Sequence, residues 1–137
     1  MSLAPLRNLT DIGLFVADLE RAMAFYGETL GFELKRHDFG FAEFHTSGVG
    51  LALWEVSNVT EALALAETPR QGLSAMVAVR VETADAVDAL HDELASKGVR
   101  IVQPPTTHPW NARTTYFSDP DDNLWEIYAW VGAPRTI

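Results

Sequence analysis

The sequence SDPDDNLWEIYAW, residues Ser118 to Trp130, is the segment around which the fold prediction is organised. It begins with a turn, because Pro120 presets the backbone and the neighbouring Asp and Asn side chains bond back to it. The strand that follows alternates between two faces. One face carries Leu124, Glu126, Tyr128 and Trp130, and the other carries Trp125, Ile127 and Ala129. Glu126 therefore lies in the middle of a strand that is too apolar for a solvated edge.

A shorter copy of this strand lies upstream. Leu53-Trp54-Glu55-Val56 matches Leu124-Trp125-Glu126-Ile127, which indicates an internal repeat. The match predicts that Trp54 and Trp125 pack beneath helices. It also predicts that Leu53, Glu55 and Glu126 point to the opposite face.

The rest of the chain supports two copies of one unit, each a strand, a helix and three strands. In the first copy, strand 8–17 leads to a helix that Asp18 caps and that ends near Leu30. Strands are expected near 32–38, 41–46 and 50–56. In the second copy, strand 75–81 leads to a helix from Thr83 to about Lys97. Strands near 99–103, 111–117 and 124–130 follow, with a proline-rich loop at 104–110.

These patterns predict a single α+β domain over residues 1–137. Module 1 covers about 8–57, a linker with a short helix covers 58–72, and module 2 covers about 73–130. Two βαβββ modules side by side make a curved mixed sheet around a cavity, with the helices outside. The residues expected to face the cavity are Asp11, Phe15, Leu53, Glu55, Met76, Arg80, Glu126 and Tyr128.

Composition limits the function. The chain has 47% hydrophobic residues, enough for a core, and lacks an apolar run long enough to span a membrane. The net charge of −9 argues against nucleic acid or an anionic membrane surface as a partner. The absence of cysteine excludes disulfides and thiolate chemistry, and it fits a cytoplasmic location.

Two phrases resemble the vicinal oxygen chelate superfamily, which includes glyoxalase I, bleomycin resistance proteins and extradiol dioxygenases. They are IGLFVADLERAMAFYGETLGF at 12–32 and TTYFSDPDDNLWEIY at 114–128. The resemblance covers nearly all of residues 9–130. It implies the glyoxalase-like fold and a homodimer, but it does not select one activity, because the superfamily includes both enzymes and binding proteins.

In metal-dependent members of this superfamily, a His or Gln on each module's first strand and a Glu on each last strand bind the ion. The resemblance transfers these roles to Asp11, Glu55, Met76 and Glu126, with Ala52 as an alternative to Glu55. Both His positions differ here, and the thioether of Met76 is too soft for a hard divalent ion. Three carboxylates, from Asp11, Glu55 and Glu126, would suit magnesium, manganese or calcium.

Two functions follow as hypotheses. The first is a small-molecule binder of the bleomycin-resistance kind, without the usual His-containing metal site and with an aromatic cavity. Its candidate ligand-binding residues are Phe15, Phe39, Phe44, Arg80, His108, Trp110, Arg113 and Tyr128. The second is a lyase, isomerase or dioxygenase with a divalent ion on Glu126, Glu55 and Asp11, and with Glu126 as catalytic base.

Structural roles compete with these assignments. A buried carboxylate needs a partner, so Glu126 could pair with Arg80 on the cavity wall. Asp11 could bond to loop amides. In the superfamily the loop that contains His108 borders the cavity mouth, yet His108 could equally be an exposed loop residue, and Trp110 could close the loop against the core.

Overall fold

The computed structural model describes residues 3–64 and 75–133. The chain divides into two compact units, residues 1–70 and 71–137. The first part of the predicted linker 58–72 forms a helix, and its remainder lies outside the described residues. None of the described helices has the length and apolar character needed to cross a membrane.

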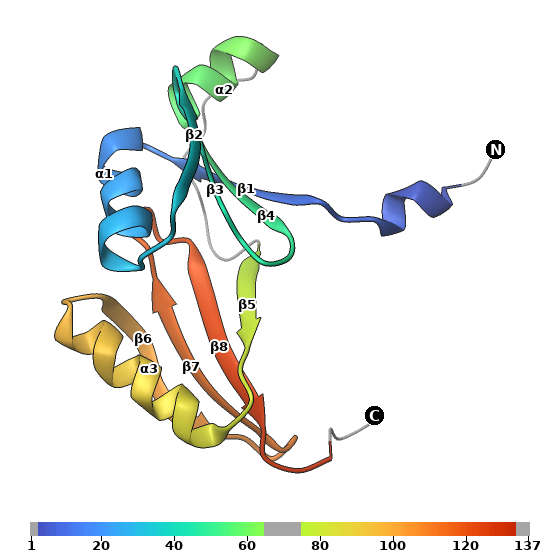
Figure 1. The fold of residues 1–137 in the computed structure, drawn as a ribbon, viewed down its shortest axis with the longest axis vertical. Coiled ribbons are helices and arrows are strands. Elements are labelled where there is room, and N and C mark those ends of the chain that lie inside the picture. Colours follow the sequence, from blue (N-terminus) through green and yellow to red (C-terminus); the bar gives the residue numbers. More distant parts are fainter. Residues whose placement is uncertain (1–2, 65–74, 134–137) are drawn as a thin grey trace. The chain divides into compact units, whose positions relative to one another are not determined.

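Unit 1 is a four-stranded mixed sheet with a helix packed on one side (Figure 1). Its strand order is β1-β4-β3-β2, in which β1 and β4 are parallel and the other pairs are antiparallel. The elements are η1 (Ala4–Arg7), β1 (Asp11–Val16), α1 (Leu19–Ala24), η2 (Phe25–Thr29), β2 (Leu34–Asp38), β3 (Phe41–Phe44), β4 (Gly50–Glu55) and α2 (Val56–Leu63).

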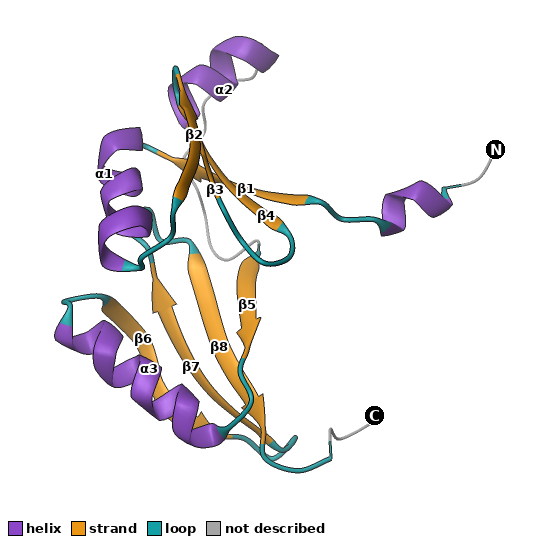
Figure 2. Ribbon diagram, in the orientation of Figure 1, coloured by secondary structure: helices purple, strands orange, loops and turns teal. Residues whose placement is uncertain are grey.

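Unit 2 repeats this topology with the order β5-β8-β7-β6, and β5 and β8 form its parallel pair. Helix α3 lies across one face of β6, β7 and β8 (Figure 2). The elements are β5 (Met76–Arg80), α3 (Ala84–Ser96), β6 (Arg100–Thr107), β7 (Ala112–Ser118) and β8 (Leu124–Trp130). The predicted repeat and the α+β class are therefore confirmed, as two four-stranded sheets.

Both long helices begin where their capping residues predict. The Asp18 carboxylate accepts a hydrogen bond from the Arg21 amide at 3.1 Å, and the Thr83 hydroxyl accepts one from the Ala86 amide at the same distance. The two helices end differently. The last turn before Gly31 is π-helical over Phe25–Thr29, whereas α3 is a regular α-helix.

The core of each unit lies between its sheet and its main helix. In unit 1, Phe44 and Leu53 are buried, and the Phe44 ring lies 6.2 Å from the ring of Tyr26, which follows α1. In unit 2, Trp125 and Ile127 are buried beneath α3. The placement predicted for Trp125 is correct, but the placements predicted for Leu53 and Trp54 are wrong, because Leu53 lies on the helix side of its sheet and Trp54 on the other side.

The error comes from the register of β4. Counted from the cap residues Asp18 and Thr83, Gly13 and Ala78 are equivalent positions on the first strands. Gly13 pairs with Ala52, whereas Ala78 pairs with Glu126. The LWEV and LWEI segments are therefore offset by three residues, and an odd offset reverses every side chain across the sheet. Ala52, the alternative raised from the sequence, is the counterpart of Glu126.

The proline-rich segment also differs from the prediction. It continues β6 as far as Thr107 instead of forming a loop from residue 104. Pro104 and Pro105 fit there because β6 is an edge strand, and its pairing with β7 shifts register between Gln103 and Thr106. Proline lacks the N–H that an inner strand would need.

Candidate functional site

The side of each sheet away from its main helix carries the candidate site residues. We call these surfaces open face A, with Phe15, Phe41 and Trp54 in unit 1, and open face B, with Arg80, Tyr116, Glu126 and Tyr128 in unit 2. The pairing of adjacent strands places each set on one side of its sheet, since paired residues point the same way.

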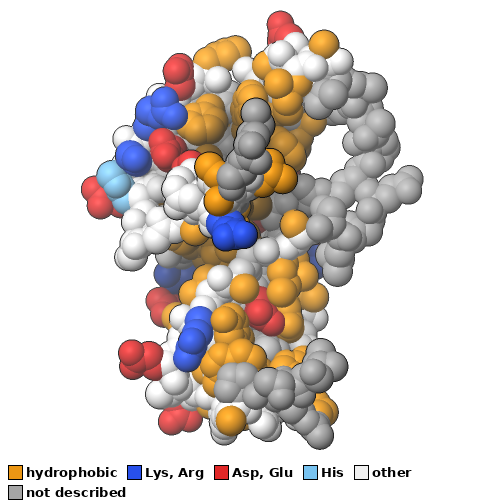
Figure 3. All heavy atoms as spheres, turned by 90° about the vertical axis from the view of Figure 1, so that its right-hand side faces the viewer, with side chains coloured by type: hydrophobic (Ala, Val, Ile, Leu, Met, Phe, Trp, Pro, Cys, Tyr) orange, Lys and Arg blue, Asp and Glu red, His pale blue; other side chains and the backbone are white. Residues whose placement is uncertain are grey.

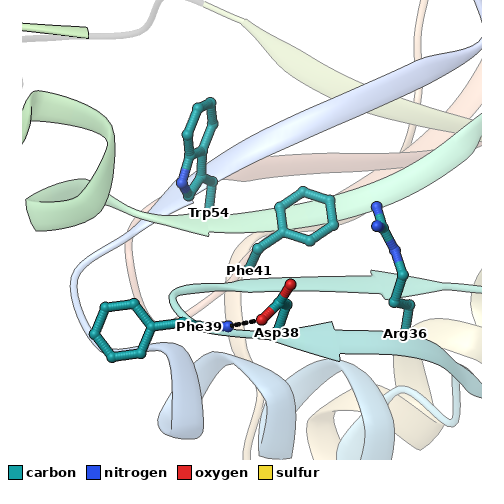
Figure 4. Close-up of a pocket in the computed structure, with 5 residues that line it drawn as sticks. All are labelled: Arg36, Asp38, Phe39, Phe41 and Trp54. Atoms are coloured by element: carbon teal, nitrogen blue, oxygen red, sulfur yellow. Dashed lines mark hydrogen bonds between the residues drawn. The ribbon is translucent and has the colours of Figure 1, made fainter. Parts of the chain in front are cut away.

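Open face A contains a hollow of about 350 Å³. It is lined by Arg36, Asp38, Phe39, Phe41 and Trp54 (Figure 4). Phe41 and Trp54 are paired residues on β3 and β4, so their rings lie side by side on this face. Phe39 stands in the β2–β3 turn with 88% of its surface exposed. The hollow thus offers apolar ring surface to solvent, next to two charged side chains.

The two charged side chains in the hollow, Arg36 and Asp38, differ in whether a side chain of opposite charge lies beside them. The guanidinium of Arg36 lies 5.0 Å from the centre of the Phe41 ring, and its Nε lies 3.4 Å from the Glu43 carboxylate. One carboxylate oxygen of Asp38 accepts a hydrogen bond from the Phe39 amide at 2.7 Å. Within the described residues Asp38 has no cationic partner. Glu43 also contacts Lys35, whose Nζ lies 3.8 Å from its other oxygen, so the carboxylate of Asp38 is the group that the hollow offers to a cation.

Glu126 on open face B accepts a hydrogen bond from the side chain of Tyr116. The Tyr116 hydroxyl donates a short hydrogen bond to one Glu126 oxygen, and the two residues are directly paired across β7 and β8. Burial, followed by this bond and the charge of Glu126, raises the pKa of Tyr116 to about 12. Tyr116 consequently keeps its proton at neutral pH and acts as a fixed donor. The pairing of Glu126 with Arg80 that the sequence left open does not form.

His108 and Trp110 lie together next to open face B. Their rings are stacked with centroids 4.2 Å apart, and His108 Nε2 is 2.8 Å from the hydroxyl of Thr114, a buried residue paired with Tyr128. His108 is half-buried and Trp110 is 48% exposed. His108 is therefore not simply an exposed loop residue, because its ring contacts Trp110 and Thr114. Trp110 does not close the loop against the core, because nearly half of its surface is exposed.

Three predicted site residues lie on the helix side of their sheets instead. Phe44 is 2% exposed and packs on Tyr26. Arg113 binds the carboxylate of Asp88 on α3, with 2.8 Å between Nε and Oδ1. Glu55 accepts a hydrogen bond from the Leu19 amide at 2.9 Å, so its charge stabilises the N-terminus of α1. For each of these residues, the contact made by the side chain is structural.

The proposed carboxylate metal site is not supported. Asp11 lies on open face A, where Thr10 donates to one oxygen at 2.8 Å, and Glu55 lies on the opposite side of the same sheet. The two carboxylates cannot share an ion. Residues 3–64 and 75–133 contain no group of three His, Cys, Asp or Glu side chains able to hold a metal.

The donor atoms at the superfamily's ligand positions lead to the same conclusion. With the corrected register, these positions hold Asp11, Ala52, Met76 and Glu126. Alanine supplies no donor atom, a thioether is a poor ligand for hard divalent ions, and one Glu126 oxygen already accepts a hydrogen bond. These residues do not fit the chelate.

Sequence reasoning missed Phe41 and Trp54 in the hollow and Tyr116 beside Glu126. The alternation Phe41, Ala42, Glu43, Phe44 carries a signal for the first, since Phe44 belongs to the core and Phe41 must then face the other way. No comparable signal marks Tyr116, because its contact with Glu126 depends on the register of β7 against β8.

Known proteins share this fold and sequence pattern. The family model described as the glyoxalase/bleomycin resistance protein/dioxygenase superfamily matches residues 8–127. A crystal structure of a glyoxalase/bleomycin resistance protein/dioxygenase from Nocardioides has 37% identity and a TM-score of 0.85, covering 95% of this chain and 89% of that one.

Two further relatives differ in function. A glyoxalase-related enzyme from Fulvimarina pelagi shows 29% identity and a TM-score of 0.79, over 95% of this chain and 96% of its own. A bleomycin resistance protein from Geobacillus stearothermophilus is 28% identical over 80% of this chain and 86% of its own. Sequence identity to this chain is therefore about equal for a glyoxalase-related enzyme and for a bleomycin resistance protein. The match of the family model over residues 8–127 agrees with the internal repeat and the strand topology. This chain belongs to the glyoxalase/bleomycin resistance protein/dioxygenase superfamily.

Proposed function

We propose that this protein binds a flat, positively charged small molecule on open face A, without a chelated metal ion. The observation that carries the proposal is the aromatic hollow of about 350 Å³ beside the uncompensated carboxylate of Asp38. Ligand pockets combine apolar and aromatic walls with a few placed polar groups, and this hollow has that composition.

The chemistry of the lining selects a cation. A planar cation gains from stacking on Phe41 and Trp54, because the face of an aromatic ring attracts positive charge. Asp38 adds a direct ionic contact. Glu43 compensates the Arg36 guanidinium in part, because Lys35 contacts the same carboxylate, so we expect the ligand's positive charge on the Asp38 side of the hollow. The name of the bleomycin resistance protein among the relatives supports binding as the class of function.

Calorimetric titration of the full chain with 9-aminoacridine, a planar aromatic cation, tests the proposal. We expect saturable binding that Trp54→Ala weakens by about tenfold, or 1.4 kcal/mol. The planar anion 9-anthracenecarboxylate should bind less tightly, and Asp38→Asn should reduce that difference. Bleomycin is a further probe on the same variants.

The control removes exposed apolar surface elsewhere. Val102→Ala changes a side chain that is 51% exposed on the edge strand β6, and it should leave the affinity for 9-aminoacridine unchanged. Equal affinities in wild type and Trp54→Ala, with both proteins folded by circular dichroism, would refute the proposal.

A homodimer in the cytoplasm is part of the same proposal. Edge strands β1 and β5 each carry a single charged residue and no proline, whereas edge strand β2 carries Lys35, Arg36 and Asp38 and edge strand β6 contains two prolines. Phe15 and Met76 on β1 and β5 are 47% and 49% exposed, and Figure 3 shows further hydrophobic side chains on the surface of both units. Light scattering coupled to size-exclusion chromatography measures the state directly, and a monomer at all concentrations would contradict it.

A further inference from the structure

Open face B carries two opposite charges that do not neutralise each other. Arg80 pairs with Tyr128 and Ala78 pairs with Glu126, so Arg80 and Glu126 occupy diagonal positions on neighbouring strands. Strand spacing and rise place their Cα atoms about 8 Å apart. No ion pair joins these two described side chains.

Each charge is available for a ligand. Arg80 is exposed, and its side chain has no hydrogen-bond or ion-pair partner within residues 3–64 and 75–133. Tyr116 holds one oxygen of Glu126, so the carboxylate is fixed in orientation. Its second oxygen has no partner among the described residues. A guanidinium binds a carboxylate through two parallel hydrogen bonds, and a carboxylate binds an ammonium.

An aromatic surface adjoins the two charges. Tyr128 is the residue paired with Arg80, and its ring meets the ring of Trp130 edge-on at 5.8 Å between centroids. Both side chains are half-buried on the same side of β8 as Glu126. They offer apolar area to a side chain, adjacent to the charged pair.

We propose that open face B binds a small amino-acid-like zwitterion, with its carboxylate on Arg80, its ammonium on Glu126 and its apolar side chain on Tyr128. This site goes beyond the aromatic hollow of unit 1. A simple anion would be repelled by Glu126 and a simple cation by Arg80, so the pair selects against ligands with one charge.

Three probes of similar size separate these cases: L-phenylalanine, phenethylamine and 3-phenylpropionate. They carry both charges, the positive charge alone and the negative charge alone. Saturation-transfer NMR titrations on the full chain at neutral pH should show L-phenylalanine binding about tenfold more tightly than either of the others.

Charge-neutral variants should shift this order in opposite directions. Arg80→Gln should lower the affinity for L-phenylalanine by about tenfold and raise the affinity for phenethylamine. Glu126→Gln should lower the affinity for L-phenylalanine and raise the affinity for 3-phenylpropionate. Arg113→Gln is the matched control, because it removes the same charge from the opposite side of the same sheet, and it should change none of the three affinities.

The proposal is overturned if L-phenylalanine does not bind, if the three probes bind alike, or if Arg113→Gln and Arg80→Gln have equal effects. These outcomes are independent of the function proposed for unit 1. The 9-aminoacridine titration on Trp54→Ala reports on open face A, and Arg80→Gln leaves the hollow intact.

Discussion

The last strands of the two units, β4 and β8, occupy equivalent positions in the same topology but place different side chains on the open face. Both strands lie in the second position of their sheets, parallel to the first strand. β8 presents Glu126 on its open face, held by Tyr116, whereas β4 presents Ala52 at the equivalent position. The glutamate of β4, Glu55, lies three residues further on and binds the start of α1. Similar residues therefore lie on the open face in one unit and contact the helix in the other.

The two open faces differ accordingly. Open face A is aromatic, with a hollow between Phe41, Trp54 and the exposed Phe39. Open face B carries a carboxylate held by Tyr116 and a guanidinium that has no partner in the part of the chain that the structure describes. A duplicated unit keeps the core that stabilises it, while the opposite face is free to change because it contributes less burial.

The largest effect should come from Leu53 on β4. Leu53 is fully buried on the helix side, so Leu53→Ala should cost about 3 kcal/mol of unfolding free energy through lost burial and a cavity. Trp54→Ala on the open face removes a larger side chain but should cost only about 1 kcal/mol. Urea unfolding followed by circular dichroism measures both, and the reverse order would show that β4 faces the other way.

A smaller effect should separate the two glutamates. Glu55→Ala removes the acceptor of the Leu19 amide and should destabilise the protein by about 1 kcal/mol. Glu126→Ala leaves the half-buried Tyr116 hydroxyl within reach of water and should cost under about 0.5 kcal/mol. Urea midpoints at constant m-value compare them. Equal losses would mean that the two residues have equivalent roles after all.

The last effect concerns Tyr116, and it is absent at neutral pH and visible only at high pH. The pKa of Tyr116 is raised from 10.0 to about 12, so its proton stabilises the folded state below pH 10.0, and this contribution is lost as pH rises through about 12. The ultraviolet absorbance of phenolate should show a transition near pH 12 that Tyr116→Phe abolishes. Glu126→Gln should lower its midpoint, because the hydrogen bond and charge of Glu126 contribute to the shift. An unmoved midpoint would contradict the pairing.

Much of the fold was predictable from local signals. Asp18 and Thr83 mark the two helix starts, and the alternation in 124–130 gave the correct faces of β8. The candidate site was predictable only in part. Arg80, Glu126 and Tyr128 share a face as expected, but Phe44, Glu55 and Arg113 lie on the helix side of their sheets. In unit 1 the error followed from matching Glu55 to Glu126 by sequence likeness.

The sequence by itself determined the repeat, the order of elements and the superfamily, because periodicity, caps and turns act over a few residues. Strand register in the folded chain sets which glutamate lies on an open face and which one binds the start of a helix. Side-chain direction in a strand reverses with every residue, so a shift of three positions in β4 exchanges its two faces. The pairing of Tyr116 with Glu126 and the separation of Arg80 from Glu126 likewise depend on strand register, which contacts distant in sequence determine.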